Sequence, residues 1–240
     1  MISQTSARLS PDEALALFQH GNLIDLGEQA HATRLRIANP DVVTYVVDRN
    51  INYSNVCAAQ CDFCAFYRKP DDPEAFLLSN EEIYRKIREL LEIGGTTILL
   101  QGGLHPSLDF SYYTRVLSAI KERFQVCIHA FSPPEIVWMA HLYSRSVRDI
   151  IADLRSAGLD SLPGGGAEIL SDRVRTRVSR GKCNSAEWLG VMEEAHRLGL
   201  RTTATMMFGH VETYADRVEH LRCLRDLQDR TRGFTAFICW

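Results

Sequence analysis

The sequence predicts an α/β fold in which six parallel strands form a barrel-like sheet behind an N-terminal helical extension. Three observations predict it: β-branched and aromatic runs recur along the chain, helical stretches separate them, and most runs end in small or polar residues. Strands that alternate with helices favour right-handed βαβ units and a parallel sheet. The 240 residues and 45% hydrophobic content are enough to bury the core of one domain.

The first predicted element is the helical extension, over residues 1–42. From Ser10 to Arg36, apolar residues are spaced as in short amphipathic helices. Ser10 is the expected N-cap, Pro11 lies in the first turn, and acidic residues follow it. We expect residues 43–240 to form the barrel domain.

Six β-branched and aromatic runs predict the strands of that domain. They span residues 42–53, 96–103, 125–132, 159–166, 201–209 and 234–240. Two of the helices between them have clear boundary signals. One follows the N-cap Ser79, has Glu82 in capping-box position and stops at Gly94; the other is expected to be capped by Ser185 and to end at Gly199.

Small or polar residues follow five of these six strands. They are the cysteine-rich segment after residue 53, Gly102–Gly103, Ser132, Gly164–Glu168 and Gly209–His210. In parallel α/β folds the carboxyl ends of the strands share one edge, where loops vary over a rigid sheet and ligands bind. The sequence therefore predicts a single site at this edge.

Charge and composition narrow the partners of that site. The formal net charge is -3 and no basic stripe is present, so nucleic acid and anionic membranes are not expected partners. No apolar run approaches the ~20 residues of a membrane-spanning helix, and the N-terminus lacks a secretory signal pattern. Seven cysteines without a disulfide-scaffold spacing suit a reducing compartment. We expect a cytoplasmic protein with a small-molecule substrate.

Three cysteines form the strongest motif, with Cys57, Cys61 and Cys64 at C-x3-C-x2-C spacing. A structural zinc site uses four ligands, commonly in paired C-x2-C units. A 4Fe–4S cluster also takes four thiolates, so three clustered thiolates indicate a cluster with one iron open to another ligand. Polar neighbours such as Gln60 and Asp62 disfavour inert buried cysteines. We favour the open cluster, with a zinc site and inert cysteines as alternatives.

The same motif, with the aromatic Phe63 before its third cysteine, resembles the signature of the radical S-adenosylmethionine (SAM) superfamily. The resemblance implies a partial (β/α)6 TIM-like barrel and a 4Fe–4S cluster whose open iron binds the amino and carboxylate groups of SAM. It also implies a one-electron donor such as flavodoxin or ferredoxin. The non-enzyme alternatives are an iron–sulfur protein that binds SAM without turnover and a zinc-stabilised binding domain.

The resemblance further implies which residues contact the cofactor. Six are expected to do so: Phe63, Gln101, Gly102, Gly103, Ser132 and Glu168. Phe63 would pack beside the adenine, the glycines after Gln101 would let the backbone approach the methionyl group, and Glu168 would bind the ribose. Ser132 ends the third strand at the same edge.

Longer segments, among them "ILLQGGLHP", "HAFSPPEI" and "GLDSLPGGGAEIL", resemble the dehypoxanthine futalosine cyclases of menaquinone biosynthesis. The resemblance extends from Asp48 onward. It implies that a 5'-deoxyadenosyl radical removes the C4' hydrogen of the substrate sugar, after which the sugar carbon closes onto the benzoate ring. Aminofutalosine synthase and the synthase subunit that forms the F420 deazaflavin chromophore share the scaffold and are the alternatives.

Two features differ from that family. The chain stops at Trp240, directly after the sixth strand, where family members carry a further helix, and Cys239 stands where the family commonly has proline. We therefore expect the barrel to be incomplete at its C-terminus.

Substrate and base residues have weaker signals. His105 and His129 are candidates for substrate binding, and His210 with Glu212 for the base that restores the aromatic ring. The alternative is that these histidines satisfy backbone groups at strand ends. His196 is expected on a solvated helix face, whereas Met206–Met207 are expected in the core.

Overall fold

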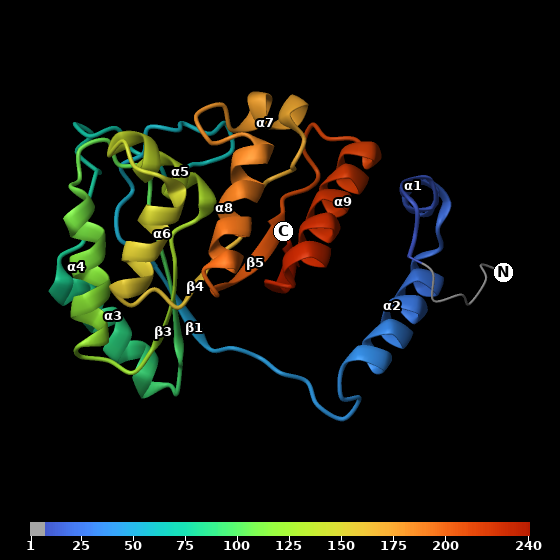
Figure 1. The fold of residues 1–240 in the computed structure, drawn as a ribbon, viewed down its shortest axis with the longest axis horizontal. Helices are drawn as coiled ribbons and strands as arrows, with labels where there is room; N and C mark the ends of the chain where they lie inside the picture. Colours follow the sequence, from blue (N-terminus) through green and yellow to red (C-terminus); the bar gives the residue numbers. More distant parts are fainter. Residues whose placement is uncertain (1–7) are drawn as a thin grey trace.

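The computed structural model describes residues 8–240 and confirms the α/β fold (Figure 1). Its six-stranded sheet has the order β1-β2-β3-β4-β5-β6, and each strand pairs in parallel with the next. The strands are β1 (Asp48–Asn52), β2 (Thr97–Gln101), β3 (Cys127–Ala130), β4 (Ser161–Leu162), β5 (Arg201–Met206) and β6 (Phe234–Cys239). Because β1 and β6 are the two ends of this order, the sheet is the predicted partial barrel.

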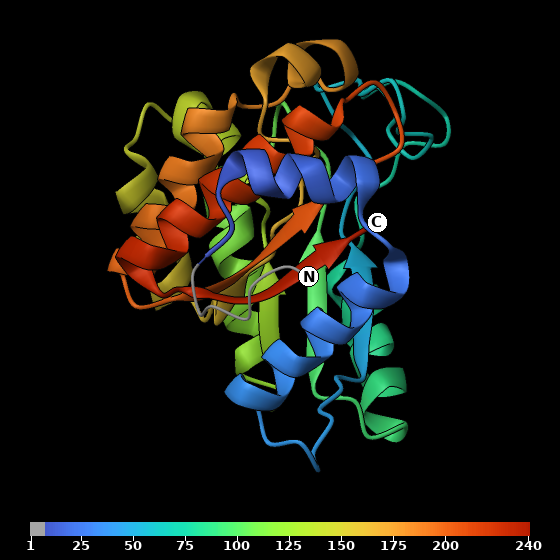
Figure 2. The ribbon, with the colours of Figure 1, turned by 90° about the vertical axis from the view of Figure 1, so that its right-hand side faces the viewer.

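The helices of residues 8–240 are α1 (Pro11–His20), α2 (Leu23–Ile37), α3 (Asn80–Glu92), α4 (Phe110–Lys121), α5 (Pro133–Leu142), α6 (Val147–Ser156), α7 (Asp172–Val178), α8 (Ser185–Arg197) and α9 (Tyr214–Thr231). α1 and α2 precede β1, whereas α3 to α9 connect successive strands and cover the outer face of the sheet. Figure 2 shows α1 lying along α9, and the two helices are in contact. Among the helices of residues 8–240, none is long and apolar enough to span a membrane.

The core lies between the strands and helices α3 to α8. Its fully buried side chains include Ile51, Ile98, Leu100, Ile128 and Leu162 from the strands, and Ile83, Leu117, Ile150 and Trp188 from the helices. The predicted burial of Met206 and Met207 is confirmed. Burial alternates along β2 and β5, because successive side chains of a strand point to opposite faces of the sheet.

The capping signals were read correctly at two helices and one residue late at a third. Ser10 and Ser79 each accept from the backbone three residues on and complete a capping box. At α8 the cap is Asn184, whose side chain accepts from the backbone N–H of Glu187, and Ser185 is already helical. An asparagine amide oxygen serves as well as a serine hydroxyl at this position.

All six strands are shorter than the predicted runs, and β1 and β4 are shortened most, each for a pairing reason. Residues 42–47 are not part of β1, because its neighbour in the sheet, β2, begins at Thr97, which pairs with Asp48. β4 ends before Pro163, which has no N–H to donate. Beyond it, threonine side chains of β5 replace the ladder: Thr203 accepts from the backbone N–H of Gly164, and Thr205 donates to its carbonyl.

Candidate active site

A cavity of about 270 Å³ opens at the carboxyl edge of the sheet. It is lined by the predicted cluster and cofactor residues Cys57, Cys61, Phe63, Cys64, Gln101, Gly102, Gly103, Ser132 and Glu168. These residues follow β1, β2, β3 and β4 along the chain. The parallel sheet therefore brings together residues more than a hundred positions apart in the sequence.

The loop that carries the three cysteines, residues 57–64, is called the cysteine loop and is held in place by backbone hydrogen bonds at several points. The Cys57 N–H donates to the carbonyl of Arg68, the Ala58 N–H to that of Leu104, and the Asp62 N–H to that of Val178, at 3.0 to 3.1 Å. The loop is thus attached to the segment that follows β2 and to α7.

The sulfur of Cys57 accepts hydrogen bonds from two backbone N–H groups. Its Sγ lies 3.4 Å from the backbone N of Ala59 and 3.3 Å from that of Leu104, both in donor geometry. Hydrogen bonds to a ligating sulfur tune the reduction potential of iron–sulfur clusters. At Cys61, burial raises the pKa of the thiol to about 11, opposed by the nearby charge of Lys182.

The donor set fits a 4Fe–4S cluster better than a single metal ion. Within residues 8–240, no three His, Cys, Asp or Glu side chains are grouped closely enough to hold one ion. A zinc site needs such a group, whereas each thiolate of a cluster binds a different iron. Cys57, Cys61 and Cys64 all line the same cavity, so they would hold the cluster there.

Glycines bring the end of β2 against this loop. A Cβ at Gly103 would lie 2.1 Å from the carbonyl oxygen of Val56 and 2.7 Å from Cβ of Cys57. A Cβ at Gly102 would lie 2.4 Å from the Tyr53 ring. Only glycine permits these approaches, and the absent side chains leave backbone exposed to the cavity, as the methionyl part of a cofactor would require.

Glu135 is a cavity residue that the sequence analysis missed. Its carboxylate accepts from the Tyr53 hydroxyl, the Gly102 N–H, and both the N–H and hydroxyl of Ser132, at 2.7 to 3.1 Å. Burial raises the pKa of this carboxyl, while these donors act in the opposite direction. One side chain thus fixes the ends of β1, β2 and β3. The spacing Ser132-x-x-Glu135, a capping box, was the signal available.

Glu168 and Lys182 form a buried ion pair at the opposite wall. Lys182 Nζ lies 2.7 Å from Glu168 Oε1, and the side chains are 20% and 1% exposed. Burial acts to lower the pKa of Lys182, but the carboxylate of Glu168 outweighs it and raises that pKa. Glu168 has a positive φ of 42°, a strained conformation of the kind found at functional sites. Lys182 was also missed, and no motif pointed to it.

The histidines predicted to bind substrate do not line this cavity. His105 accepts through Nδ1 from the backbone of Ser107, and burial lowers its pKa. His129, on β3, contacts the hydroxyls of Ser161 at 2.7 Å and Thr203 at 3.4 Å. Burial lowers the pKa of His129 to about 4. Both rings already have protein partners.

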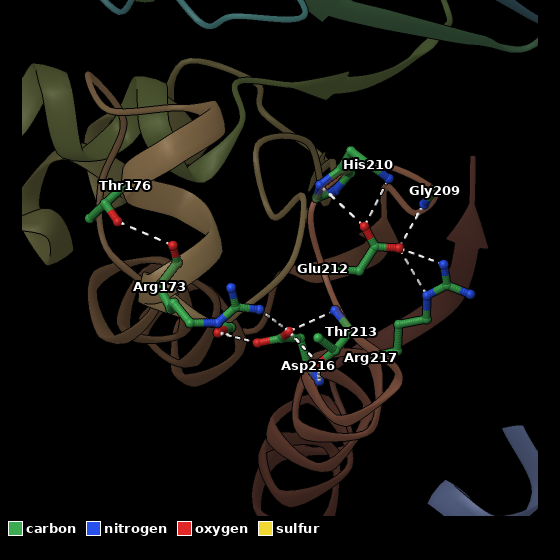
Figure 3. A network of polar contacts seen from close by, with 9 residues as sticks. Arg173, Thr176, Gly209, His210, Glu212, Thr213, Asp216 and Arg217 are labelled. Atoms are coloured by element: carbon green, nitrogen blue, oxygen red, sulfur yellow. Dashed lines mark hydrogen bonds and ion pairs between the residues drawn. The ribbon is translucent and has the colours of Figure 1, made fainter. Parts of the chain in front are cut away.

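The residues predicted as the base lie in a separate network after β5 (Figure 3). Glu212 accepts from the backbone of Gly209 and from Arg217 through Oε1, and from the backbone of His210 through Oε2. Burial alone would raise its pKa, but these donors lower it to about 2. His210 Nδ1 approaches Glu212 to 3.2 Å without hydrogen-bond geometry, and its Nε2 contacts the Met207 carbonyl.

Figure 3 also shows how this network connects α7 to α9. Asp216 accepts from the backbone and hydroxyl of Thr213 at the start of α9, and from Ser171 and Arg173 at the start of α7.

His196 differs from its predicted solvated state. It is partly buried, lies 2.6 and 2.7 Å from two threonine hydroxyls, and packs against the edge of the Phe234 ring.

Sequence and structure comparisons show which known proteins this chain is similar to. The profile of the Radical SAM superfamily matches residues 51–224. Cyclic dehypoxanthine futalosine synthase of Halalkalibacterium halodurans is 44% identical over 97% of this chain and 63% of its own length. FO synthase of Nocardia farcinica is 44% identical over 97% of this chain and 27% of its own.

A third relative is 5-amino-6-(D-ribitylamino)uracil--L-tyrosine 4-hydroxyphenyl transferase of Methanopyrus kandleri, 43% identical over 87% of this chain and 57% of its own. The chain thus spans about six tenths of the length of the first relatives it matches. Among solved structures, the FeFe-hydrogenase maturase HydG from Carboxydothermus hydrogenoformans has the same fold. It superposes with a TM-score of 0.75 at 19% identity, over 97% of this chain and 53% of that one.

Proposed function

The chain belongs to the radical SAM superfamily, and from this premise we propose that it cyclises dehypoxanthine futalosine in the futalosine route to menaquinone. The proposed reaction removes the C4' hydrogen of the substrate sugar and closes that carbon onto the benzoate ring. The observation that carries the radical SAM part is the cavity, which joins three cysteine thiols, the glycine end of β2 and the Glu168 carboxylate. The futalosine part is supported by the resemblance from Asp48 onward.

The cluster and SAM, when bound, supply the radical reagent: one electron splits the sulfonium into methionine and a 5'-deoxyadenosyl radical. The protein has to position the reactants and exclude water. Cys57, Cys61 and Cys64 hold the cluster, and Gly102 with Gly103 lets the methionyl group approach the backbone.

The other walls of the cavity orient the nucleoside part of the cofactor. Glu168 accepts a hydrogen bond from the ribose, and Phe63 packs beside the adenine. Glu135 acts indirectly, because it holds Gly102 and Ser132 by hydrogen bonds rather than contacting the ligand. Trp240 also lines the cavity, and its ring centre lies 6.4 Å from that of Phe63 in an edge-on arrangement.

Further assignments belong to the same proposal. A flavodoxin- or ferredoxin-type donor delivers the electron in the cytoplasm, and the substrate is a small molecule. His210 accepts the final proton, whereas His105 and His129 do not line the cavity and are not assigned to the substrate. For His210, this role predicts that His210→Ala retains 5'-deoxyadenosine formation but loses cyclised product.

A second candidate function is a step of deazaflavin synthesis. It is favoured by the identity to the FO synthase and transferase relatives, which is as high as the identity to the futalosine relative. Such an enzyme would use 5-amino-6-(D-ribitylamino)uracil and tyrosine in place of dehypoxanthine futalosine.

The deciding experiment uses substrate deuterated at C4' in an anaerobic assay with dithionite as reductant. We expect the label in 5'-deoxyadenosine, and an organic product that has lost two hydrogens by mass. Unlabelled 5'-deoxyadenosine in step with product would place the abstraction elsewhere. Turnover of 5-amino-6-(D-ribitylamino)uracil with tyrosine, or of the enol-ether precursor of aminofutalosine, with none of dehypoxanthine futalosine would assign the chain to a sister function.

A further inference from the structure

Lys182 occupies an unusual position between two walls of the cavity. Its ammonium lies 2.7 Å from Glu168 Oε1 and 5.4 Å from the centre of the Phe63 ring. All three side chains line the cavity. A single cation thus touches both the residue proposed to bind the ribose and the residue proposed to pack beside the adenine.

The chain builds this position with a buried arginine. Arg175, 3% exposed, donates to the carbonyls of Gly166, Ala167 and Cys183 at 2.5 to 3.1 Å. It therefore connects the segment after β4 to the loop between α7 and α8 that carries Lys182.

A second close approach fixes the same loop from the side of the cysteines. A Cβ at Gly181 would lie 2.5 Å from Cα of Ala59, inside the cysteine loop. The backbone beside Lys182 is thus held by close contacts on both sides.

The Glu168 carboxylate is left half satisfied by this arrangement. Lys182 takes Oε1, whereas Oε2 is buried and has no hydrogen-bond partner within residues 8–240. A buried acceptor without a donor costs about 1–3 kcal/mol. Glu168 lines the cavity, so a ligand bound there can supply the missing donor, and a ribose hydroxyl is such a donor.

We propose that Lys182 is a positioning residue, which occupies Glu168 Oε1 and thereby directs Oε2 alone to one ribose hydroxyl of the cofactor. The inference rests on the proposed use of SAM and goes beyond it in one respect. A carboxylate held at one oxygen recognises one of the two ribose hydroxyls, whereas a free carboxylate can rotate and accept from either.

The test measures ligand discrimination by the oxidised, anaerobic holoenzyme. S-Adenosylhomocysteine and its 2'-deoxy and 3'-deoxy analogues are titrated calorimetrically, since none of them can be cleaved reductively at a sulfonium. For the wild-type chain we expect one deoxy analogue to bind about 10–100-fold more weakly, the range for a hydrogen bond to a charged group. The other analogue should bind within about 3-fold of the parent, because the carboxylate offers one oxygen only.

The variant Lys182→Met should reduce this discrimination to less than about 3-fold, because either Glu168 oxygen can then accept. Lys182→Arg keeps the charge and should preserve the discrimination. Arg180→Met is the matched control, an exposed residue two positions away, and should leave all three affinities unchanged. Iron content is measured on every variant, and Lys182→Gln replaces Lys182→Met if the methionine variant does not hold iron.

Full discrimination in an iron-replete Lys182→Met or Lys182→Gln would overturn the proposal, since the ion pair would then only neutralise a buried charge. Equal loss for both deoxy analogues in the wild-type chain would also overturn it, because Glu168 would bind both hydroxyls. Neither result depends on dehypoxanthine futalosine. Failure of that substrate alone would contradict the proposed function and leave the assignment of Lys182 intact.

Discussion

Two buried glutamates follow strands at the same edge of the sheet, yet their surroundings differ. Glu168, after β4, has one oxygen on Lys182 and the other without a partner. Glu212, after β5, has both oxygens on donors of its own loop and of Arg217. A carboxylate with an unfilled acceptor can bind a ligand, whereas a filled one holds the protein together. The comparison teaches that position at the strand ends is not enough to identify a binding residue.

The largest effect is expected in the ligand-binding region, at the cysteine loop. Cys61→Ala should lower the iron content of anaerobically reconstituted protein from about four to less than one per chain, because two thiolates are too few to hold a cluster. SAM cleavage should become undetectable. Iron analysis and chromatography of 5'-deoxyadenosine measure both effects.

Cys127→Ala is the control, since this cysteine is exposed and lies on β3 rather than in the cysteine loop. It should retain normal iron and activity. A Cys61→Ala protein with a full complement of iron and normal SAM cleavage would contradict the assignment of the cluster to this loop.

The next effect concerns the close approach at Gly103. Gly103→Ala places a methyl group 2.1 Å from the Val56 carbonyl oxygen, so the end of β2 or the cysteine loop must move. A displacement of about 1 Å near a reacting centre can cost about 100-fold in rate. We expect SAM cleavage to fall by about 10–100-fold, measured as kcat with saturating SAM. Unchanged kcat would show that the β2 end does not position the cofactor.

On the structural side of the comparison, Glu212→Gln should destabilise the fold with little effect on SAM binding. The amide group cannot accept from all the donors that Glu212 now faces, and an unsatisfied buried group costs about 1–3 kcal/mol. Urea denaturation of both proteins measures this difference. If the variant instead lost SAM cleavage at wild-type stability, Glu212 would belong to the catalytic machinery.

The same carboxylate predicts a dependence of stability on pH. Its pKa is about 2 in the folded chain against an ordinary value of 4.5, so its contribution is present above pH 4.5 and is lost as the pH falls toward 2. The shift corresponds to roughly 3 kcal/mol. Between pH 5 and pH 3, wild-type stability should therefore decrease more than that of Glu212→Gln. Parallel curves would contradict this assignment.

The fold, and the convergence of the three cysteines and the strand-end glycines at one cavity, could be predicted from the sequence because local signals carry them. Cysteine spacing, glycines at strand ends and the Ser79 capping box each act over a few residues. Lys182 could not be found in this way, because its partner Glu168 is fourteen residues distant and reaches it only through the loop that Arg175 anchors.

The sequence-based prediction was also wrong at two places whose structure depends on contacts with residues distant in the sequence. Residues 42–47 have strand composition but lack a partner strand, since β2 begins opposite Asp48. His196 was assigned to a solvated face from its helical context, and the packing of Phe234 from β6 buries part of it. In both places, tertiary contacts override the local pattern.

The smallest expected effect comes from comparing two glycines. A Cβ at Gly103 would clash with the cysteine loop, whereas a Cβ at Gly190 would not. Gly190 lies on the exposed side of α8, and a Cβ there would have no neighbour within 4 Å. Glycine in a helix interior is less favourable than alanine by about 0.5–1 kcal/mol. Gly190→Ala should therefore raise the free energy of unfolding by about that amount and leave iron content and SAM cleavage unchanged. Thermal and urea denaturation of Gly190→Ala and Gly103→Ala, each compared with the wild-type chain, measure the difference in the free energy of unfolding. A loss of activity in Gly190→Ala would contradict this prediction. It would mean that α8 needs flexibility for function, so that a glycine is required at position 190 for a reason other than close contact.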